Sequence, residues 1–330
     1  MARAWNLVSR PDGMPVLENF ALKDLPDSPL QDGQFRVKNT WLSVDPYMRS
    51  RMSEAKSYAA SYALNEPMIG GAFGEVIESQ NPDFPVGAKV AHGLGWRDEA
   101  VLGGPDQMAN KVPETGLPDH LWLSNMGLTG GTAWMGLLKV AHAKEGETVF
   151  VSAAAGAVGS AVVQLAKAKG MTVIGSAGGP EKCAWVLELG ADACLDYKAG
   201  PIEPQLAKAA PEGIDVYFDN VGGEHLDAAF GQAREMARFA ICGMIDRYND
   251  QSPVMMKNLI RIIPARIKVE GFLYPDFMSD IPEFMKDMGA LIAAGQVTSR
   301  ETIKDGLESA PEAFLGLFTG ENMGKMLVRL

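Results

Sequence analysis

The chain has 330 residues, of which 47% are hydrophobic, and its 30 Lys and Arg against 41 Asp and Glu give a net charge of −11. Its length favours two domains that each bury a core, and its apolar fraction is typical of a globular protein. The acidic charge, with no run of Lys or Arg to offset it, argues against nucleic acid and membrane as partners, so any site for an anion must be local.

The cysteines and the apolar segments indicate where the protein works. Its three cysteines, Cys183, Cys194 and Cys242, are too few and too scattered for a disulfide framework, which favours a reducing, cytoplasmic location. The N-terminus lacks the apolar segment of a secretory signal. Two uncharged runs, 121–138 and 148–166, are interrupted by glycines and polar residues, so neither predicts a membrane helix.

Residues 1 to about 120 contain short strand-like segments separated by Pro and Gly. They include Phe35-Arg36-Val37-Lys38, Trp41-Leu42-Ser43-Val44, Gly74-Glu75-Val76-Ile77-Glu78 and Ala88-Lys89-Val90-Ala91. Short strands with turn signals between them predict a compact β domain or barrel over residues 1–123. The alternation in Lys325–Leu330 predicts a last strand that returns to this domain, so that residues from about 297 to 330 complete it.

From Leu123 to about Gly295 the pattern changes to strands that alternate with helices. Further parallel strands are expected at 213–220, 238–243 and 267–272, with helical stretches between them. This alternation predicts a second domain over residues 124–296, built as a Rossmann-type, doubly wound parallel sheet. The expected fold class is therefore α/β.

The segment 147–182 carries the strongest functional pattern. The strand-forming residues Thr148–Val151 lead into a turn, Gly156-Ala157-Val158-Gly159, after which the apolar spacing becomes that of a helix. A second strand, Thr172-Val173-Ile174, follows. Glycines let the backbone approach a ligand, and the N–H groups at a helix start attract a pyrophosphate, so this segment predicts a dinucleotide site. The alternative is an α/β core that binds no nucleotide.

The end of the second strand indicates which dinucleotide is bound. An NAD site places Asp or Glu there, whereas an NADP site leaves room and supplies cations. This strand runs into Gly175-Ser176-Ala177-Gly178-Gly179-Pro180, with no carboxylate before Glu181, and Lys182 follows. A glycine-rich bend with an ammonium group behind it favours NADPH. The alternative is that Lys182 is an ordinary solvated lysine in the next helix.

Several short motifs occur in a fixed order along nearly the whole chain. They are Leu42-Ser43-Val44-Asp45-Pro46-Tyr47-Met48-Arg49, the turn 153–159, Phe218-Asp219-Asn220-Val221-Gly222-Gly223, Cys242-Gly243-Met244-Ile245 leading to Tyr248-Asn249, Gly271-Phe272-Leu273, and Asn322-Met323-Gly324-Lys325. Together they make the chain resemble the zinc-free medium-chain dehydrogenases/reductases. The resemblance is to the branch of NADPH-dependent alkenal/enone double-bond reductases, which includes prostaglandin, leukotriene and curcumin reductases. It implies that the first domain is a GroES-like barrel.

The resemblance implies a metal-free reaction. A hydride passes from NADPH to the β-carbon of an α,β-unsaturated ketone or aldehyde, and a proton then reaches the α-carbon. Such chemistry requires positioning and a donor aimed at the carbonyl oxygen. Zinc-dependent relatives carry a Gly-His-Glu segment and a cysteine cluster in the first domain. Here that domain has no cysteine, and its His92 and His120 lack metal spacing, so we interpret both as surface or core residues.

The same resemblance assigns the cofactor-binding residues. The turn 156–159 would hold the pyrophosphate, Lys182 and Tyr197 the 2′-phosphate and ribose, and Phe272 and Leu273 the carboxamide. The remaining positions are Asn220, Cys242, Gly243, Met244, Ile245, Tyr248 and Asn322. The alternative interpretation of Asn220 is that it only forms a turn, and that of Cys242 is that it is a small buried apolar residue.

Two tyrosines compete for the role of donor to the substrate. By resemblance Tyr248 is the catalytic residue near the nicotinamide ribose, and Tyr47 contacts substrate from the first domain, with interdomain packing as its alternative. A phenol is protonated at neutral pH, so either can donate without tuning. Trp134 and Tyr274 are the other expected substrate contacts. Trp134 stands where relatives have Tyr, and Pro180 stiffens the 2′-phosphate bend, so both depart from the family pattern.

Other functions stay open beside enone reduction. The alternatives are a quinone reductase and a sensor that binds NADPH without turnover, because a reductase-like fold does not guarantee catalysis. A metal-dependent alcohol dehydrogenase is the reading that the sequence favours least. The expected partners are a small enone or alkenal and, by resemblance, a second copy of the chain in a homodimer.

Overall fold

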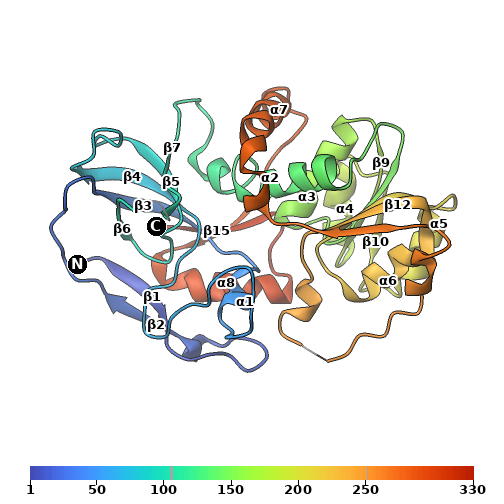
Figure 1. Cartoon of the computed structure of the whole chain (residues 1–330), viewed down its shortest axis with the longest axis horizontal. Coiled ribbons are helices and arrows are strands. Elements are labelled where there is room, and N and C mark those ends of the chain that lie inside the picture. Colours follow the sequence, from blue (N-terminus) through green and yellow to red (C-terminus); the bar gives the residue numbers. More distant parts are fainter. Residues whose placement is uncertain (105–106, 251) are drawn as a thin grey trace. The chain divides into compact units, whose positions relative to one another are not determined.

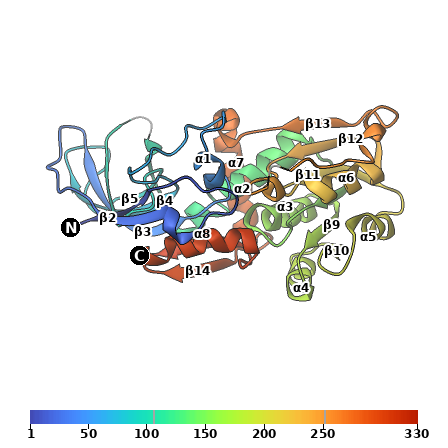
Figure 2. The same cartoon turned by 90° about the horizontal axis from the view of Figure 1, so that it is seen from below.

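The computed structural model describes residues 1–104, 107–250 and 252–330 and contains two compact units (Figures 1 and 2). The α/β unit comprises Ser124–Arg300 and Met323–Lys325. The β unit comprises Met1–Leu123, Glu301–Asn322 and Met326–Leu330.

The α/β unit is built on a six-stranded parallel sheet. Its strands are β8 (Thr148–Val151), β9 (Thr172–Ala177), β10 (Ala193–Asp196), β11 (Ile214–Asp219), β12 (Ala233–Ile241) and β13 (Lys268–Gly271). They lie in the order β10-β9-β8-β11-β12-β13, so the direction of winding reverses between β8 and β11. This is the doubly wound arrangement that the sequence predicts.

Helices cover both faces of this sheet because successive side chains of a buried strand point to opposite faces. Phe150 and Tyr217 belong to the apolar core that includes residues of α5 (Ile202–Ala209) and α6 (Gly223–Gln232). The neighbouring Phe218 faces the other way, toward Gly136. That side carries α2 (Leu128–Trp134), its π-helical continuation η4 (Met135–Val140), α3 (Ala157–Ala168), α4 (Pro180–Glu188) and α7 (Ile281–Ala293). Figure 1 shows α2 and α3 on one side of the sheet and α6 on the other.

Short 3-10 turns follow β12 and β13. They are η5 (Ile245–Arg247), η6 (Leu259–Ile262) and η7 (Tyr274–Asp280). β12 begins at Ala233, five positions before the strand predicted at 238–243, and its pairing with β11 shifts register between Ile214 and Val216. Met236 has φ +63°, a left-handed conformation that sequence periodicity does not indicate.

The β unit has a sheet in the order β14-β15-β3-β4-β5-β7, antiparallel from β15 to β7, with β6 paired antiparallel to β3, and a separate antiparallel β1–β2 pair. The strands are β1 (Arg3–Leu7), β2 (Phe20–Asp24), β3 (Phe35–Ser43), β4 (Ala72–Ser79), β5 (Lys89–His92), β6 (Glu99–Leu102), β7 (Asn110–Lys111), β14 (Glu301–Asp305) and β15 (Lys325–Arg329). The helical segments are α1 (Met48–Arg51), α8 (Ala310–Thr319), η1 (Leu17–Asn19), η3 (Asp119–Leu123) and η8 (Leu307–Ser309). The predicted fold class, a parallel doubly wound sheet with a separate β domain, is confirmed.

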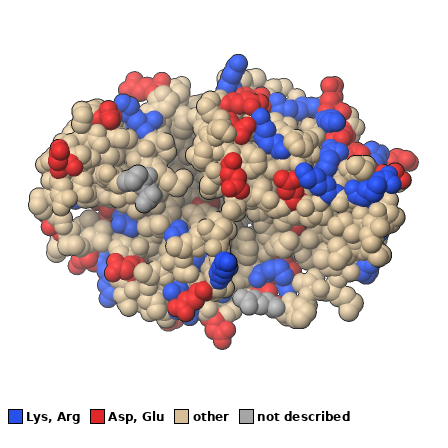
Figure 3. Space-filling view, in the orientation of Figure 1, with Lys and Arg blue, Asp and Glu red and all other residues tan. Residues whose placement is uncertain are grey.

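Charges of both signs are interspersed on the face shown in Figure 3, where Lys and Arg alternate with Asp and Glu. Within the described residues, no helix is both long and apolar enough to cross a bilayer.

Two histidines are buried as neutral rings. In the β unit His92 Nε2 lies 2.8 Å from Asn39 Oδ1, and its Nδ1 accepts the N–H of Leu94 at 3.1 Å. Burial, and then the charge of Arg97, lowers the pKa of His92 to about 3. In the α/β unit His225 Nε2 lies 2.8 Å from Ser176 Oγ, and burial lowers its pKa to about 4. Both pKa values lie well below that of a solvated histidine.

We predict that acid destabilises both units through these rings. The unfolded chain takes up a proton at each histidine near pH 6.5, whereas the folded protein does not, so stability is full above that pH and falls below it. At pH 5 each ring costs about 2 kcal/mol of unfolding free energy. Urea unfolding at pH 7.5 and pH 5 measures the loss. H92Q and H225Q should each lose less stability between these pH values than the wild type, and an equal loss in all three proteins would contradict the assignment.

Candidate nucleotide-binding and active site

Most of the residues predicted to bind the cofactor lie at the carboxyl ends of neighbouring strands in the α/β unit. The glycine turn follows β8, Asn220 follows β11, and the segment from Cys242 to Tyr248 follows β12. Phe272 and Leu273 follow β13. Open parallel sheets bind ligands at this edge, where the strand order reverses, so the fold gathers these residues at a physically suitable place.

The glycine turn is held tightly against the start of α3. Ala153 has φ +48°, and the N–H of Ala154 donates to the Ser176 carbonyl at 2.8 Å. A Cβ at Gly159 would lie 2.2 Å from the Ala153 oxygen, so this close helix packing requires glycine. The first N–H groups of α3, from Ala157 on, have no carbonyl within the helix to bond. These N–H groups and the helix dipole suit a pyrophosphate.

The buried carboxylate of Asp219, at the end of β11, holds the turn and the neighbouring loops in place. Its Oδ1 accepts four hydrogen bonds, from Tyr217 Oη (2.7 Å), Ser152 Oγ (3.1 Å) and the N–H groups of Val221 (2.9 Å) and Gly222 (2.8 Å). Its backbone carbonyl accepts the N–H groups of Cys242 and Gly243. Burial raises the pKa of Asp219, while the hydrogen bonds oppose that rise. No donor among the described residues bonds its other oxygen, Oδ2.

Asn220 ties the end of β11 to the glycine turn. Its side-chain Nδ2 donates to the Ser152 carbonyl at 2.8 Å, and its backbone N–H donates to Ser152 Oγ at 2.9 Å. The amide nitrogen is therefore used within the protein, as the turn-residue alternative requires. Burial, with the charge of Asp219, raises the pKa of Cys242 to about 12, so this thiol stays protonated and is a poor nucleophile.

The hydroxyl of Tyr248 lies at the carboxyl end of β12. A Cβ on Gly243 would come within 3.0 Å of Tyr248 Oη, so the ring rests over this glycine. Nearby Gly222 has φ +76° and lies against the Met244 side chain. The absence of side chains at both glycines lets Tyr248 Oη and Met244 approach the backbone closely.

The bend predicted to hold the 2′-phosphate lies between β9 and α4. Gly179 has φ +95°, and its N–H donates to Asp196 Oδ1 at 2.8 Å. A Cβ at Gly178 would lie 2.5 Å from Tyr197 Oη, so the tyrosine packs directly on the bend. Burial, and then the charge of Lys198, lowers the pKa of Lys182. The charges of Lys182 and Lys198 repel each other, so both lie near this bend, and a pair of cations suits a phosphate dianion.

Lys198 was not identified from the sequence. The signal that could have found it is its position directly after Tyr197, which was itself predicted to bind the ribose and phosphate. Asp219 and Ser152 were also not given roles, although Asp219 lies within a recognised motif. A carboxylate at the end of an apolar strand is the pattern that could have indicated it.

The residues after β13 line the same edge of the sheet. Phe272 is buried against Phe218, with ring centroids 6.1 Å apart. Tyr274 is half-buried, and burial raises its pKa. Its ring packs on Gly131, where a Cβ would be 2.4 Å from Cε2.

The structure corrects the expected role of Trp134. Only 1% of its surface is exposed, and its indole N–H donates to Asp287 Oδ2 on α7 at 2.7 Å. Lys139 Nζ lies 5.0 Å from the ring centroid. Because both the ring face and the N–H are used in packing α2 against α7, Trp134 has no surface left for a substrate.

The β unit contributes a group of tyrosines next to α1. Burial, and then the charge of Asp45, raises the pKa of Tyr47 well above its usual value, so the phenol stays protonated. Tyr62 Oη donates to the Ile69 carbonyl at 2.7 Å, and the Arg51 guanidinium lies 4.4 Å from the Tyr62 ring centroid. Tyr47 packs partly against this unit's apolar core. Asn322, the last predicted cofactor contact, is a half-buried residue of the same unit.

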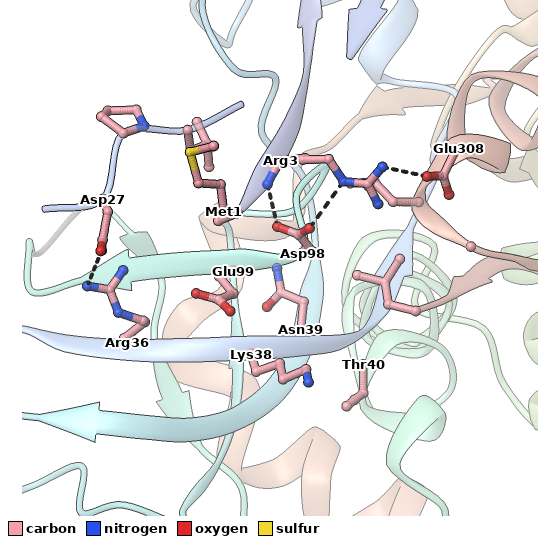
Figure 4. A pocket seen from close by; sticks show the side chains of 16 residues that line it. Met1, Arg3, Asp27, Arg36, Lys38, Asn39, Thr40, Asp98, Glu99 and Glu308 are labelled. Carbon is pink, nitrogen blue, oxygen red and sulfur yellow. Dashed lines mark hydrogen bonds and ion pairs between the residues drawn. The ribbon is translucent and has the colours of Figure 1, made fainter. Parts of the chain in front are cut away.

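The β unit also contains a cavity of about 640 Å³ near both chain ends (Figure 4). Arg3 bonds Asp98 and Glu308 there, and Arg36 lies 3.8 Å from Asp27. Its charged side chains are therefore largely neutralised by one another, and no predicted site residue lines it.

Comparison with known proteins places the chain in a family. Residues 3–112 match the N-terminal domain of oxidoreductase, and residues 157–290 match the zinc-binding dehydrogenase domain. Within the described residues, no group of three His, Cys, Asp or Glu side chains could hold a metal ion.

Individual relatives match over most of their length. The NADPH-dependent curcumin reductase of Escherichia coli is 40% identical over 99% of this chain and 96% of its own. A 2-alkenal reductase (NADP(+)-dependent) of Nicotiana tabacum is 41% identical over 88% of this chain and 86% of its own. The chain in the crystal structure of CurA from Vibrio vulnificus in complex with NADPH is 42% identical in sequence. The match covers 99% of this chain and 98% of that one, with a TM-score of 0.94. The chain belongs to the medium-chain dehydrogenase/reductase family, in its branch of NADPH-dependent alkenal and enone double-bond reductases.

We predict that Gly159→Ala prevents nucleotide binding. The added Cβ would be 2.2 Å from a backbone oxygen, so the turn must open or α3 must move, at about 1–3 kcal/mol of unfolding free energy. Gly200→Ala is the matched control, because a Cβ there meets nothing within 4 Å. NADPH fluorescence titration and urea unfolding of both variants test this. Wild-type affinity in Gly159→Ala would contradict the assigned role of the turn.

Proposed function

We propose that the protein uses NADPH to reduce the carbon–carbon double bond of α,β-unsaturated ketones and aldehydes. One observation carries the proposal of NADPH as cofactor. The α/β unit has both a glycine turn at the point where the strand order reverses and a bend with two lysines after the neighbouring strand. Membership of the double-bond reductase branch supports the substrate class. The α/β unit is then the NADPH-binding domain, and the β unit the substrate domain.

The residues fit NADPH along its whole length. The N–H groups of Ala157, Val158 and Gly159 would bind the pyrophosphate, with Gly156 leaving room for it. Lys182, Lys198 and Tyr197 would bind the 2′-phosphate and ribose. The nicotinamide half would lie along Asn220, Cys242, Gly243, Met244, Ile245, Tyr248, Phe272, Leu273 and Asn322. When bound, NADPH supplies the hydride for the β-carbon of the substrate.

Tyr248 is the proposed donor to the substrate carbonyl oxygen, where negative charge develops during reduction. Its hydroxyl, held beside Gly243, would donate a hydrogen bond or pass on a proton from water. Tyr47 and Tyr274 would contact the substrate. Burial keeps both of these phenols protonated, so they can only donate to its oxygen and cannot remove a proton.

The reaction as proposed does not use zinc. The donor set supports this, since both ring nitrogens of His92 are engaged by Asn39 and Leu94. A hydrogen-bond donor can stabilise the developing oxyanion in place of a Lewis acid.

A homodimer and a cytoplasmic location complete the proposal. β13 is an edge strand of the parallel sheet, and an unpaired edge is a template for pairing with another strand. Exposed apolar side chains lie on this strand and in the segment before it, at Val269, Ile263, Ile260, Leu259 and Met255. A second copy joined at this edge would cover them. The three cysteines are free thiols, which suits a reducing compartment.

We predict that the protein consumes NADPH with enones and alkenals faster than with quinones. The assay follows the near-ultraviolet absorbance of NADPH over a panel of alkenals, bulky enones and quinones, and it is repeated with NADH. Lys182→Ala should raise the KM for NADPH about tenfold or more and leave that for NADH unchanged, because a charge-assisted bond to phosphate is worth about 1.5–3 kcal/mol.

Lys208→Ala, at an exposed position on α5, is the control and should behave as the wild type. If only quinones are reduced, the protein is a quinone reductase and the proposed enone reduction is wrong. Tight NADPH binding without any turnover would favour the sensor.

Tyr248→Phe should lower kcat about 100-fold while the dissociation constant for NADPH changes little, since it removes one donor to the oxyanion. Tyr47→Phe is the comparison and should raise the KM for the enone more than it lowers kcat. Steady-state kinetics and fluorescence titration separate these effects. An unchanged kcat in Tyr248→Phe would exclude this phenol as the donor.

A further inference from the structure

Two of the three cysteines lie together beside the bend for the 2′-phosphate. Cys183 is in the first turn of α4, and Cys194 is on β10. Both thiols approach the Ala177 carbonyl at the end of β9, with Cys183 Sγ 3.9 Å from its oxygen. Cys194 Sγ lies 3.9 Å from the position of a Cβ on Gly175, two residues before Ala177 on β9, so both thiols lie beside the same end of this strand and each interacts with the other. Cys242 follows β12, on the other side of the central strand β8.

The second cysteine of the pair packs beside a glycine. Cys194 lies opposite Gly175 in the pairing of β10 with β9, and a Cβ on Gly175 would come within 3.9 Å of Cys194 Sγ. Both cysteines are half-buried, so a small oxidant can reach them while large reagents are hindered. Neither thiol has a role in the proposed reaction.

We propose that Cys183 and Cys194 are a modification site at which a hydroperoxide produces an intramolecular disulfide. The Cys183 sulfur attacks one peroxide oxygen and breaks the O–O bond, which gives a sulfenic acid and, from hydrogen peroxide, one water. The Cys194 sulfur then attacks the sulfenic sulfur and displaces its oxygen as a second water. In total two thiols lose two electrons and two protons, and one peroxide is reduced.

The surroundings of the two thiols set the rate at which the disulfide forms. Burial raises the pKa of both thiols, and that of Cys194 the more strongly, so little thiolate exists at neutral pH. Because the thiolate is the nucleophile, the pair stays reduced under brief exposure and closes under sustained exposure. The rate should increase as the pH rises.

The disulfide would act on the cofactor site next to it. Bonded sulfurs lie closer than hydrogen-bonded thiols, so closure draws the first turn of α4 toward β10. Lys182 belongs to that turn, and Asp196, which holds Gly179, belongs to that strand. This part of the inference rests on the proposed function. It predicts weaker NADPH binding and unchanged NADH binding, because NADH has no 2′-phosphate.

Thiol titration of the intact protein after treatment with hydrogen peroxide tests the site. The wild type should fall from three thiols to one and recover three with dithiothreitol, and Cys242→Ser should fall from two to none. Cys183→Ser should keep both of its thiols under the same treatment, whereas Cys194→Ser should stop at the sulfenic acid of Cys183, which dimedone traps, and form no internal disulfide. Peptide mapping without reductant should find 183 linked to 194. Three remaining thiols in the treated wild type, or loss of the Cys242 thiol first, would overturn the proposal.

NADPH and NADH titrations of the same samples test the link to the cofactor. The oxidised wild type should bind NADPH about fivefold more weakly, the effect of displacing one partly exposed charge, and should bind NADH as before. Cys183→Ser, treated in parallel, should keep its NADPH affinity. A disulfide that leaves NADPH affinity unchanged would overturn this link. The thiol count does not depend on turnover, so it separates failure of the site from failure of the proposed reaction.

Discussion

A single buried carboxylate oxygen holds the nucleotide edge of the sheet together. Burying a carboxylate is costly unless hydrogen bonds replace its water, and Oδ1 of Asp219 has four donors, three from residues 217–222 and one from Ser152 on the neighbouring strand end. One of these donors, Ser152, begins the glycine turn after β8, and two are N–H groups at the entry to α6. The carbonyl of the same residue holds the segment after β12. The geometry of the glycine turn, of Asn220 and of the loop that carries Tyr248 therefore depends on one residue.

The bend that faces the 2′-phosphate shows how an acidic protein makes room for an anion. The net charge of −11 repels phosphates at long range, so attraction must come from cations placed within a few ångströms. Lys182 and Lys198 are the cations proposed for this role, and burial and mutual repulsion disfavour the charged form of Lys182. A phosphate dianion would relieve both. The carboxylate of Asp196 is prevented from competing because it is turned to the N–H groups of Gly179 and Lys198.

The parts of the site that the sequence predicted are those set by local pattern. The change from strand to helix spacing at residues 148–166 identified the glycine turn, and the missing carboxylate before Glu181 identified the bend. The role of Asp219 depends on donors from separate segments, which no local pattern shows. Trp134 is the opposite case: its place in a family motif suggested a ligand contact, but a carboxylate 153 positions later in the chain takes its N–H. Long-range pairing of this kind appears only in three dimensions.

The bond between the N–H of Gly324 and the carbonyl of Ala155 joins the end of the chain to the glycine turn at 2.8 Å. Gly324 has φ +71°, and a Cβ there would lie 1.9 Å from the Arg300 oxygen, so no other residue fits. The residues that follow pair with β3 in the β unit. During synthesis, neither the turn nor that sheet can be completed before residues 324–329 have been made, although domains generally fold as they emerge. A chain cut before Gly324 would therefore leave the glycine turn without this bond and β3 without its pairing with β15.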